Sequence, residues 1–346
     1  MLRELVELES PTGDTGELRE RMAAELQALG AAVAPDGEHL RADFPGDGGP
    51  LLLLGHIDTV WPRGTLATMP WRVDDGRAHG PGSYDMKGGL VVMLEAIRTA
   101  RADRPLRVVL TADEEIGSPT ARGTLERAAA GAAAALVCEP PTSRGHLKTA
   151  RKGLGRFTLR VSGRAAHAAE AERGISAIEE LARLTLRLHA LNDPTCGVSL
   201  NVGVISGGTR ENVVAAEATA LIDIRVPTID ERERIDRILR ELSAEAAGAT
   251  IDVGGGWTRP PLERSAGAAV LFERAREHGR ALGLELREAA VAGGSDCNLV
   301  GALGVPVLDG LGAEGGGAHA AGEHVLVESL AVRSELLARI LRDPGL

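Results

Sequence analysis

Histidine and carboxylate side chains gather in short segments that follow apolar runs of the chain. In the segment GHIDTV, His56 and Asp58 come directly after the apolar residues 51–54. Residues two apart on an extended chain point to the same side, so Asp58 can hold the His56 ring as a supporting carboxylate of a metal site. A structural histidine is the alternative interpretation of this pair taken alone.

A glycine-rich loop presents the next carboxylate. Asp85 lies in the segment HGPGSYDMKGG, between Gly82 and Gly88. Glycines allow unusual backbone dihedrals and a close approach of the chain, so this loop can aim Asp85 between two cations. The alternative is a turn in which Asp85 caps the following helix. The glycine spacing matches neither the dinucleotide nor the nucleoside-triphosphate pattern, which disfavours a phosphate-binding loop.

Two adjacent glutamates follow a second apolar run. In the segment TADEEIGS, Glu114 and Glu115 come just after residues 107–110. Neighbouring side chains at a strand end point apart, so one can bind a metal while the other faces a water molecule as a general base. A solvated acidic loop is the alternative, and the company of the other segments favours the catalytic interpretation.

Two further donors complete a candidate ligand set. Glu139 follows a third apolar run in LVCEP, and His319 follows a flexible loop in GGGAHAAGEHV. Histidine with several carboxylates and no cysteine is the ligand set of catalytic zinc, cobalt or manganese. Two such ions that share one carboxylate lie roughly 3.5–4 Å apart and lower the pKa of a water molecule to about 7. Such a water attacks carbonyl carbons at neutral pH.

Apolar runs that alternate with helical patterns must position these segments. Strands are expected at residues 51–54, 106–110, 133–137 and 305–308, and helices at residues 88–102, 268–282 and 325–341. This alternation predicts an α/β fold in which helices cover a mostly parallel sheet. Ligands of such open sheets bind at the carboxyl ends of the strands, which is where three of the first four segments begin.

The order of elements changes between about residues 153 and 260. Strands are expected at residues 156–161, 198–205, 218–226 and 250–253, with one helix after the first strand and one after the third. The first helix carries an apolar stripe of Ile175, Ile178, Leu181, Leu184 and Leu188, and the second a stripe of Ile235, Ile238, Leu239 and Leu242. The βαββαβ order predicts a ferredoxin-like unit. We therefore expect a catalytic domain of residues 1–152 and 261–346 with an inserted domain of residues 153–260.

The composition disfavours several classes of partner. Acidic residues outnumber basic ones by 49 to 39, and the net charge of -10 disfavours binding to nucleic acid or to an anionic membrane. No window approaches the length of a membrane span. The three cysteines are scattered singly, which indicates neither a disulfide framework nor a cysteine zinc site and fits a reducing cytoplasm. Secretion would need a leader that this sequence does not show.

Together these segments resemble the zinc metallopeptidase superfamily that includes glutamate carboxypeptidase, acetylornithine deacetylase, succinyl-diaminopimelate desuccinylase and aminoacylase. The resemblance runs along nearly the whole chain and keeps the order of the motifs. Its glutamate carboxypeptidase branch is the most similar, through GHIDTV, TMPWRVDDGRAHGPGSYDMKGG and DEEIGS. The resemblance implies two zinc ions per subunit, with cobalt or manganese as possible substitutes.

The resemblance also implies a ligand for every position of a paired-metal site. Asp85 would bridge the two ions. His56 and Glu139 would complete the site of one ion, and Glu115 and His319 the site of the other.

Catalytic roles follow from the same resemblance. Glu114 would be the general base, and Asp58 would orient His56. His167, in the segment SGRAAHA of the inserted domain, matches a histidine that reaches across a dimer to the tetrahedral oxyanion. A loop residue without a catalytic role is the alternative for His167.

Substrate contacts are implied in the inserted domain and after it. Asn212 in RENVV, Arg225 in DIRV and Arg259 in WTRPP resemble residues that hold the substrate carboxylate or help to polarise its carbonyl. A surface cation is the alternative for Arg225. The segment GGSDCN resembles a substrate loop, which gives Gly294 and Asp296 supporting roles.

Two departures from the family pattern bear on selectivity. Ala320 stands where relatives often have a serine after the last metal histidine, so different local hydrogen bonding is expected. The segment LKTARKG, with Lys148, Arg151 and Lys152, does not reproduce the glutamate carboxypeptidase pattern. Selectivity for a terminal glutamate therefore stays open.

The predicted activity is hydrolysis of an amide bond adjacent to a free carboxylate, by a glutamate-carboxypeptidase-like metallopeptidase that acts on small peptides or N-acyl amino acids. A homodimer through the inserted lid domain is implied by the resemblance. Deacylation of N-acyl amino acids and aminopeptidase action stay open as alternatives within the same chemistry. A non-catalytic metal-binding protein is the alternative from another class; it predicts a missing ligand or base, and none is missing.

Overall fold

The chain folds into two compact units in the computed structural model, which describes residues 1–100 and 104–343. The larger unit consists of Met1–Ala150, Glu263–Val291 and Ser295–Leu346, and the smaller unit of Arg151–Leu262 and Ala292–Gly294. These boundaries differ by two residues from the expected ones at 152/153 and 260/261, because Arg151 and Leu262 pair with each other in a β-bridge.

A short segment expected in the catalytic domain groups with the smaller unit instead. Ala292–Gly294 lies far from the rest of that unit in sequence. It is held there by two arginines, because Arg225 Nη1 donates to the carbonyl of Ala292 and Arg151 Nη1 to the carbonyl of Gly293.

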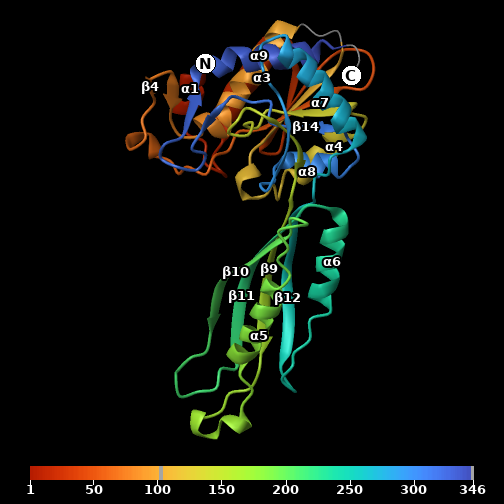
Figure 1. Ribbon diagram of the computed structural model, residues 1–346. Helices are drawn as coiled ribbons and strands as arrows, with labels where there is room; N and C mark the ends of the chain where they lie inside the picture. The colour runs from red at the N-terminus through yellow and green to blue at the C-terminus, as the bar shows by residue number, and fades with distance from the viewer. Residues whose placement is uncertain (101–103, 344–346) are drawn as a thin grey trace. The chain divides into compact units, whose positions relative to one another are not determined.

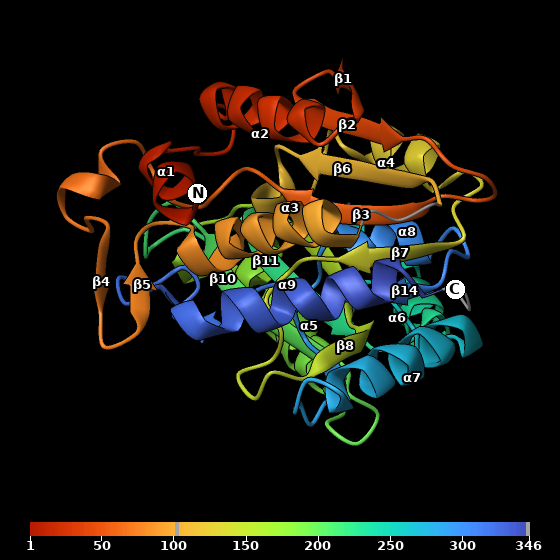
Figure 2. The same cartoon turned by 90° about the horizontal axis from the view of Figure 1, so that it is seen from above.

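Six strands form the central sheet of the larger unit (Figure 1), and Figure 2 shows them in the order β1-β2-β6-β3-β7-β14. Their bounds are Ala32–Asp36 (β1), His39–Phe44 (β2), Leu51–His56 (β3), Leu106–Thr111 (β6), Ala134–Val137 (β7) and Val307–Leu308 (β14). The four strands from β6 to β14 pair in parallel, whereas β1 and β2 add an antiparallel edge that was not predicted. The predicted α/β fold with a mostly parallel sheet is confirmed.

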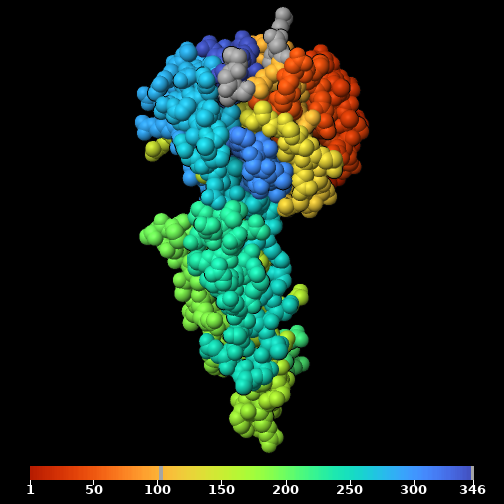
Figure 3. Space-filling model, turned by 90° about the vertical axis from the view of Figure 1, so that its right-hand side faces the viewer, coloured from red at the N-terminus to blue at the C-terminus, as the bar shows by residue number. Residues whose placement is uncertain are grey.

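Helices cover both faces of this sheet because its central strand is apolar on both sides. Leu51 and Leu53 join a core with residues of α1, α2, α3, α7 and α9, whereas Leu52 and Leu54 point to the other face, where α8 packs. Figure 2 shows α3 and α9 side by side, and Figure 3 shows α4 (yellow) beside α8 (blue). The helices are Leu2–Glu7 (α1), Gly16–Ala28 (α2), Gly88–Ala100 (α3), Arg122–Ala129 (α4), Ala266–Arg280 (α7), Asp296–Gly301 (α8) and Val327–Leu341 (α9).

The predicted helices of this unit are present with shifted ends. The helix expected at residues 88–102 is α3, and residues 101 and 102 lie outside the described part of the chain. The closing helix begins at Val327 rather than at residue 325, because His324–Leu326 pairs with Arg77–His79 as a strand.

Short elements that were not predicted frame the loops of the larger unit. One four-stranded sheet has the order β15-β16-β5-β4, and β8 pairs with β13. Their bounds are Arg72–Asp74 (β4), Arg77–His79 (β5), Leu147–Arg151 (β8), Glu288–Val291 (β13), Gly315–Gly316 (β15) and His324–Leu326 (β16). Single turns of helix lie at Thr65–Ala67 (η1), Ser83–Lys87 (η2) and Glu114–Ile116 (η3). The strand β5 leads into the loop of Asp85, and β15 and β16 flank His319.

The smaller unit has the βαββαβ order that the sequence predicted. Its antiparallel sheet has the order β10-β11-β9-β12. The elements are Gly153–Ser162 (β9), Ala168–Arg173 (η4), Ala177–His189 (α5), Ser199–Gly207 (β10), Glu217–Val226 (β11), Ile229–Arg240 (α6) and Thr250–Arg259 (β12). Burial alternates along β9 and β11, so each strand turns one face toward the core that α5 and α6 complete.

One predicted apolar stripe is partly wrong. Leu181, Leu184 and Leu188 are buried on α5, but Ile178 is 45% exposed and Ile175 precedes the helix. The helix begins later than the apolar pattern suggested because the Ser176 side chain caps it, accepting a hydrogen bond from the backbone N–H of Glu179.

Across residues 1–100 and 104–343, the helices are all too short or too polar to cross a lipid bilayer.

Candidate metal centre

His56 lies at the carboxyl end of β3, and its ring is fixed by Asp58. His56 Nδ1 lies 2.9 Å from the backbone oxygen of Asp58 and 3.5 Å from its carboxylate oxygen Oδ1. The backbone carbonyl is thus the nearer partner of the ring. The side chain of Asp58 was expected to orient His56 directly, but the Asp58 carboxylate accepts hydrogen bonds from Thr12, Glu114 and Glu115.

The carboxylate of Asp58 joins three segments. It accepts hydrogen bonds from Thr12 Oγ1 at 2.7 Å and from the backbone N–H groups of Glu114 and Glu115 at 3.1 and 3.2 Å. The side chain is fully buried. It therefore fixes the turn η3 against the end of β3.

Asp85 lies between two histidines that are far apart in sequence. Its Oδ1 is 3.1 Å from His56 Nε2, and its Oδ2 is 3.4 Å from His319 Nε2. One carboxylate thus faces both imidazoles, one oxygen to each, which is the arrangement that a ligand shared by two cations requires.

The remaining two carboxylates flank this pair. Glu139 Oε1 lies 3.7 Å from His56 Nε2, and Glu115 Oε2 lies 3.2 Å from His319 Nε2. The other oxygen of Glu115, Oε1, is buried and makes no hydrogen bond with the described residues. A buried carboxylate oxygen without a donor is costly, and a cation would satisfy it.

The donor set fits two metal ions on these observations. Potential ligand atoms of His56, Asp85 and Glu115 lie within 4.8 Å of one another, as do those of His56, Glu114 and Glu139. Two imidazoles with carboxylates and no thiolate suit zinc, cobalt or manganese. All five predicted ligands therefore meet in one place within the larger unit.

Electrostatics at the site stabilise positive charge. Burial lowers the pKa of His56, but hydrogen bonds with Asp58 and Asp85 outweigh it, and the pKa lies well above its ordinary value. Hydrogen bonds with Asp85 and Glu115 raise the pKa of His319 to about 10. Burial opposes ionisation of Asp85, yet the two histidines hold its pKa well below the usual range. The same carboxylates would stabilise bound cations.

His319 is the most accessible of the five, and its backbone is unusual. Its side chain is 51% exposed, whereas that of His56 is 2% exposed. Its φ of 59° lies in the left-handed region, which residues with a side chain seldom adopt and which is enriched at functional sites.

Glu114 lies beside the metal ligands without being needed as one. It begins η3, and its carboxylate lies within 4.8 Å of donor atoms of His56 and Glu139. Because its backbone is held by Asp58, its side chain has a defined place next to the shared site. This is the position that a general base requires.

Two further residues support the loops of the site, of which Asp296 was predicted in a supporting role and Glu323 was not predicted. Asp296 accepts hydrogen bonds from Thr111 Oγ1 at 2.6 Å and from Ser118 Oγ, so it holds the two ends of the loop that carries Glu114. Glu323 was missed: it is 1% exposed and binds the backbone of the loop that carries Asp85. Its position four residues after His319 was the only sequence signal.

His167 and Asn212 lie close together in the smaller unit. The backbone of His167 forms a β-bridge with Val213, and the backbone N–H of Ala168 donates to the carbonyl of Asn212 at 3.0 Å. Both residues are exposed. His167 follows the end of β9 at Ser162, and Asn212 follows the end of β10 at Gly207.

Arg225, Arg259 and Gly294 form a second group in the same unit. Arg225 and Arg259 both pair with Leu154, from the two sides of β9. A Cβ at Gly294 would lie 2.2 Å from the end of the Leu154 side chain, so that side chain would have to move. Leu154 and Ser162 are eight residues apart, which is about 26 Å of strand. The two groups of predicted substrate residues thus lie at opposite ends of one sheet.

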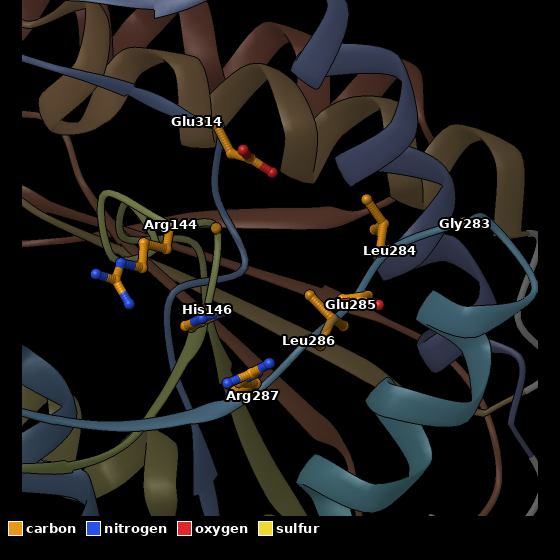
Figure 4. A pocket seen from close by; sticks show the side chains of 9 residues that line it. Arg144, His146, Gly283, Leu284, Glu285, Leu286, Arg287 and Glu314 are labelled. Carbon is orange, nitrogen blue, oxygen red and sulfur yellow. The ribbon is translucent and has the colours of Figure 1, made fainter.

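A cavity of about 400 Å³ in the larger unit contains none of the predicted site residues. It is lined by Arg144, Gly145, His146, Gly283, Leu284, Glu285, Leu286, Arg287 and Glu314 (Figure 4). Charges of both signs line it, and we assign no chemistry to it.

Comparisons with known proteins agree with this site. Residues 52–343 match Peptidase family M20/M25/M40. Carboxypeptidase G2 of Pseudomonas sp. (strain RS-16) is 30% identical over 370 residues, which cover 99% of this chain and 88% of that protein. Acetylornithine deacetylase of Pasteurella multocida is 33% identical over 201 residues, 52% of this chain and 51% of that protein. 

A solved structure shares the fold. A Bacillus subtilis protein, described as a dinuclear metal binding peptidase from the M20 family, superposes with a TM-score of 0.74 at 17% identity, over 99% of this chain and 95% of that chain. The resemblance predicted from the motifs is thereby confirmed, and the chain belongs to Peptidase family M20/M25/M40.

Proposed function

We propose that this M20 hydrolase holds two zinc ions and cleaves an amide bond adjacent to a free carboxylate, as a glutamate-carboxypeptidase-like metallopeptidase. The observation that carries the proposal is the place of Asp85 between His56 and His319, with one oxygen facing each ring. Glu139 and Glu115 complete the two ligand groups. Cobalt or manganese is the expected substitute for zinc.

The metal ions supply the electrophilic part of the chemistry. When bound, they polarise the scissile carbonyl and lower the pKa of water. His56 and Glu139 would hold one ion, Glu115 and His319 the other, and Asp85 both.

Glu114 performs the proton transfers in this proposal. Its carboxylate takes a proton from the attacking water and gives it to the leaving amine. Hydrogen bonds from the backbone of η3 to Asp58 hold it in place for both steps. General acid–base catalysis of this kind contributes about 10²–10⁴-fold to the rate.

The substrate class rests on the relatives and on the arginines of the smaller unit. Carboxypeptidase G2 is similar along 99% of the chain, which supports a carboxypeptidase. We propose that Arg225 and Arg259 hold the substrate carboxylate, with Asn212 and Gly294 as further contacts and His167 at the oxyanion. A planar guanidinium matches a carboxylate with two parallel hydrogen bonds.

Deacylation of N-acyl amino acids is the second candidate. The similarity to acetylornithine deacetylase over about half of the chain supports it, since both reactions cleave an amide next to a carboxylate. Aminopeptidase action is a third possibility, which a requirement for a free amino group would reveal.

We also propose that the enzyme is a homodimer joined through the smaller unit. The strand β10 is an edge of its sheet, and Val204 and Ile205 on it are both 52% exposed. Leu221 on the neighbouring β11 is 48% exposed. An open edge with exposed apolar residues suits pairing with a second copy.

A cytoplasmic location is proposed from the cysteines. Cys138, Cys196 and Cys297 form no disulfide, and Cys138 and Cys297 are buried. The net charge of -10 argues against nucleic acid and anionic membranes as partners.

A substrate screen with metal control tests the proposal. Zinc-loaded protein would be assayed on folate-like N-acyl glutamates, N-acetyl amino acids and dipeptides, before and after chelation. We expect hydrolysis that needs a free carboxylate, disappears with chelator and returns with zinc. Hydrolysis that survives complete metal removal would refute the metal mechanism, and activity only on substrates without a carboxylate would refute the substrate class.

A further inference from the structure

Glu323 accepts four hydrogen bonds while almost completely buried. Its Oε1 accepts from the backbone N–H groups of Tyr84 at 2.9 Å and Asp85 at 3.0 Å. Its Oε2 accepts from the backbone N–H of Gly82 at 3.0 Å and from Trp61 Nε1 at 2.7 Å. The residue is only 1% exposed. All four donors lie on other segments of the chain.

These donors connect Glu323 to each part of the metal site. Trp61 comes three residues after Asp58, on the segment that follows His56. Gly82, Tyr84 and Asp85 form the loop that presents the bridging carboxylate. Glu323 itself comes four residues after His319. One side chain thus ties together the three segments that carry His56, Asp85 and His319.

We infer that Glu323 is a positioning residue that sets the affinity for the metal pair, by fixing the backbone of Asp85 against the segment of His319. This inference rests on the proposed function for the assignment of the ligands. Glu323 would touch neither metal nor substrate. It acts on the bridging ligand Asp85 through the hydrogen bond that it accepts from the backbone N–H group of Asp85.

The four hydrogen bonds that Glu323 accepts require a carboxylate at this position. Two oxygens with about four lone-pair sites match four N–H donors. In Glu323→Gln, only one oxygen remains, and the new NH₂ group faces two N–H donors that lose their acceptor. Glu323→Asp keeps both oxygens but is one methylene shorter. Trp61→Phe keeps the carboxylate and removes a single donor.

The smaller unit offers a matched control for Glu323. Glu180 is 0% exposed and likewise accepts backbone hydrogen bonds, from Glu245 at 2.8 Å and from Ala246 at 3.0 Å. It belongs to the smaller unit, whereas the metal ligands belong to the larger one. Glu180→Gln therefore disturbs a similar buried carboxylate without touching the loops of the site.

The test measures metal affinity without substrate. Metal-free wild type, Glu323→Gln, Trp61→Phe and Glu180→Gln would be titrated with zinc against a competing chelator dye, and the visible spectra of their cobalt forms recorded. Supporting groups around metal ligands typically contribute about 10–100-fold to affinity. We expect the affinity for zinc to fall by about 10–100-fold in Glu323→Gln, with a changed cobalt spectrum. The affinity should fall less in Trp61→Phe and stay at the wild-type level in Glu180→Gln.

Several results would overturn the inference. One is a zinc affinity of Glu323→Gln equal to that of the wild type. Another is an equal loss of zinc affinity in Glu323→Gln and Glu180→Gln, because it would show a general effect of destabilisation. If Glu323→Gln fails to fold, Trp61→Phe decides, and wild-type affinity there would overturn the inference. A wild type that binds no metal would refute the proposed function as well, whereas tight binding in wild type and Glu323→Gln alike refutes only the role of Glu323.

Discussion

Asp58 accepts a hydrogen bond from the backbone N–H of Glu114, at 3.1 Å from its Oδ1. The residue expected to orient a metal ligand therefore also holds the candidate general base. Its other oxygen binds the N–H of Glu115 and the hydroxyl of Thr12. A single buried carboxylate thus fixes the relation between the end of β3 and the turn η3.

Replacing this carboxylate should harm both metal binding and turnover. Asp58→Asn keeps the size of the side chain but puts an NH₂ group where N–H donors now point. We expect metal affinity to fall by about 10–100-fold, together with kcat. Thr12→Val, which removes one hydrogen bond only, should have a smaller effect in the same direction. Equal metal affinity in Asp58→Asn and wild type would show that the backbone carbonyl alone positions His56.

Glu114→Gln should separate metal binding from catalysis. The amide cannot accept a proton from water, so kcat should fall by about 10²–10⁴-fold. Metal content, measured by elemental analysis, should stay at the wild-type level. Glu126→Gln, at an exposed position on α4, is the control and should be fully active. A Glu114→Gln variant with wild-type kcat would assign the proton transfers to another group.

The sequence predicted the central fold because its strands are buried on both faces. The run at residues 51–54 is continuously apolar, the run at residues 106–110 is interrupted only by Arg107, and they became β3 and β6. Short strands such as β5 and β16 were missed, since three-residue elements carry too little periodicity to be recognised. Their pairing is set by tertiary contacts, and it determines where His79, His324 and the adjoining loops lie.

The candidate ligands were predictable because motif order and residue type both pointed to them. The hydrogen bonds of Glu323 were not predictable, because its partners are backbone N–H groups and an indole that lie 238 to 262 residues away. The effect of Asp58 on η3 was missed for a similar reason. A side chain that binds backbone amides leaves no signature in the residue types of its partners.

Complementation should show whether active sites are shared between subunits. His167 and Arg225 lie near opposite ends of β9, about 26 Å of strand apart, which suits contributions to two different sites. In the proposed homodimer, His167→Ala and Glu114→Ala should each be nearly inactive on its own. After mixing under conditions of subunit exchange, heterodimers with one intact site should restore up to about a quarter of wild-type activity. An inactive mixture, despite confirmed exchange, would argue against shared sites.

The edge of the large sheet should lose stability in acid. Burial raises the pKa of Asp43, but hydrogen bonds from Arg41 and Arg107 outweigh it and lower the pKa. A lowered folded pKa means that the stabilisation exists above the unfolded pKa of about 3.9 and disappears as the pH falls below it. Because the carboxylate is 38% exposed, we expect no more than about 1 kcal/mol at pH 7.

Thermal unfolding of metal-free Asp43→Asn and wild type checks this expectation. The melting temperature of the wild type should exceed that of Asp43→Asn by no more than about 2 °C at pH 7. The difference should shrink as the pH falls below about 3.9 and disappear below the lowered pKa of folded Asp43. A difference that persists unchanged at pH 3 would mean that the ion pairs are not its cause.

Anomalous scattering at the zinc edge, from crystals of protein whose hydrolytic activity has been verified, tests the central claim most directly. The account predicts two peaks on either side of the Asp85 carboxylate, one beside His56 and Glu139 and the other beside Glu115 and His319. Active crystals without a peak at Asp85, or with His56 and His319 on separate sides of the larger unit, would contradict it.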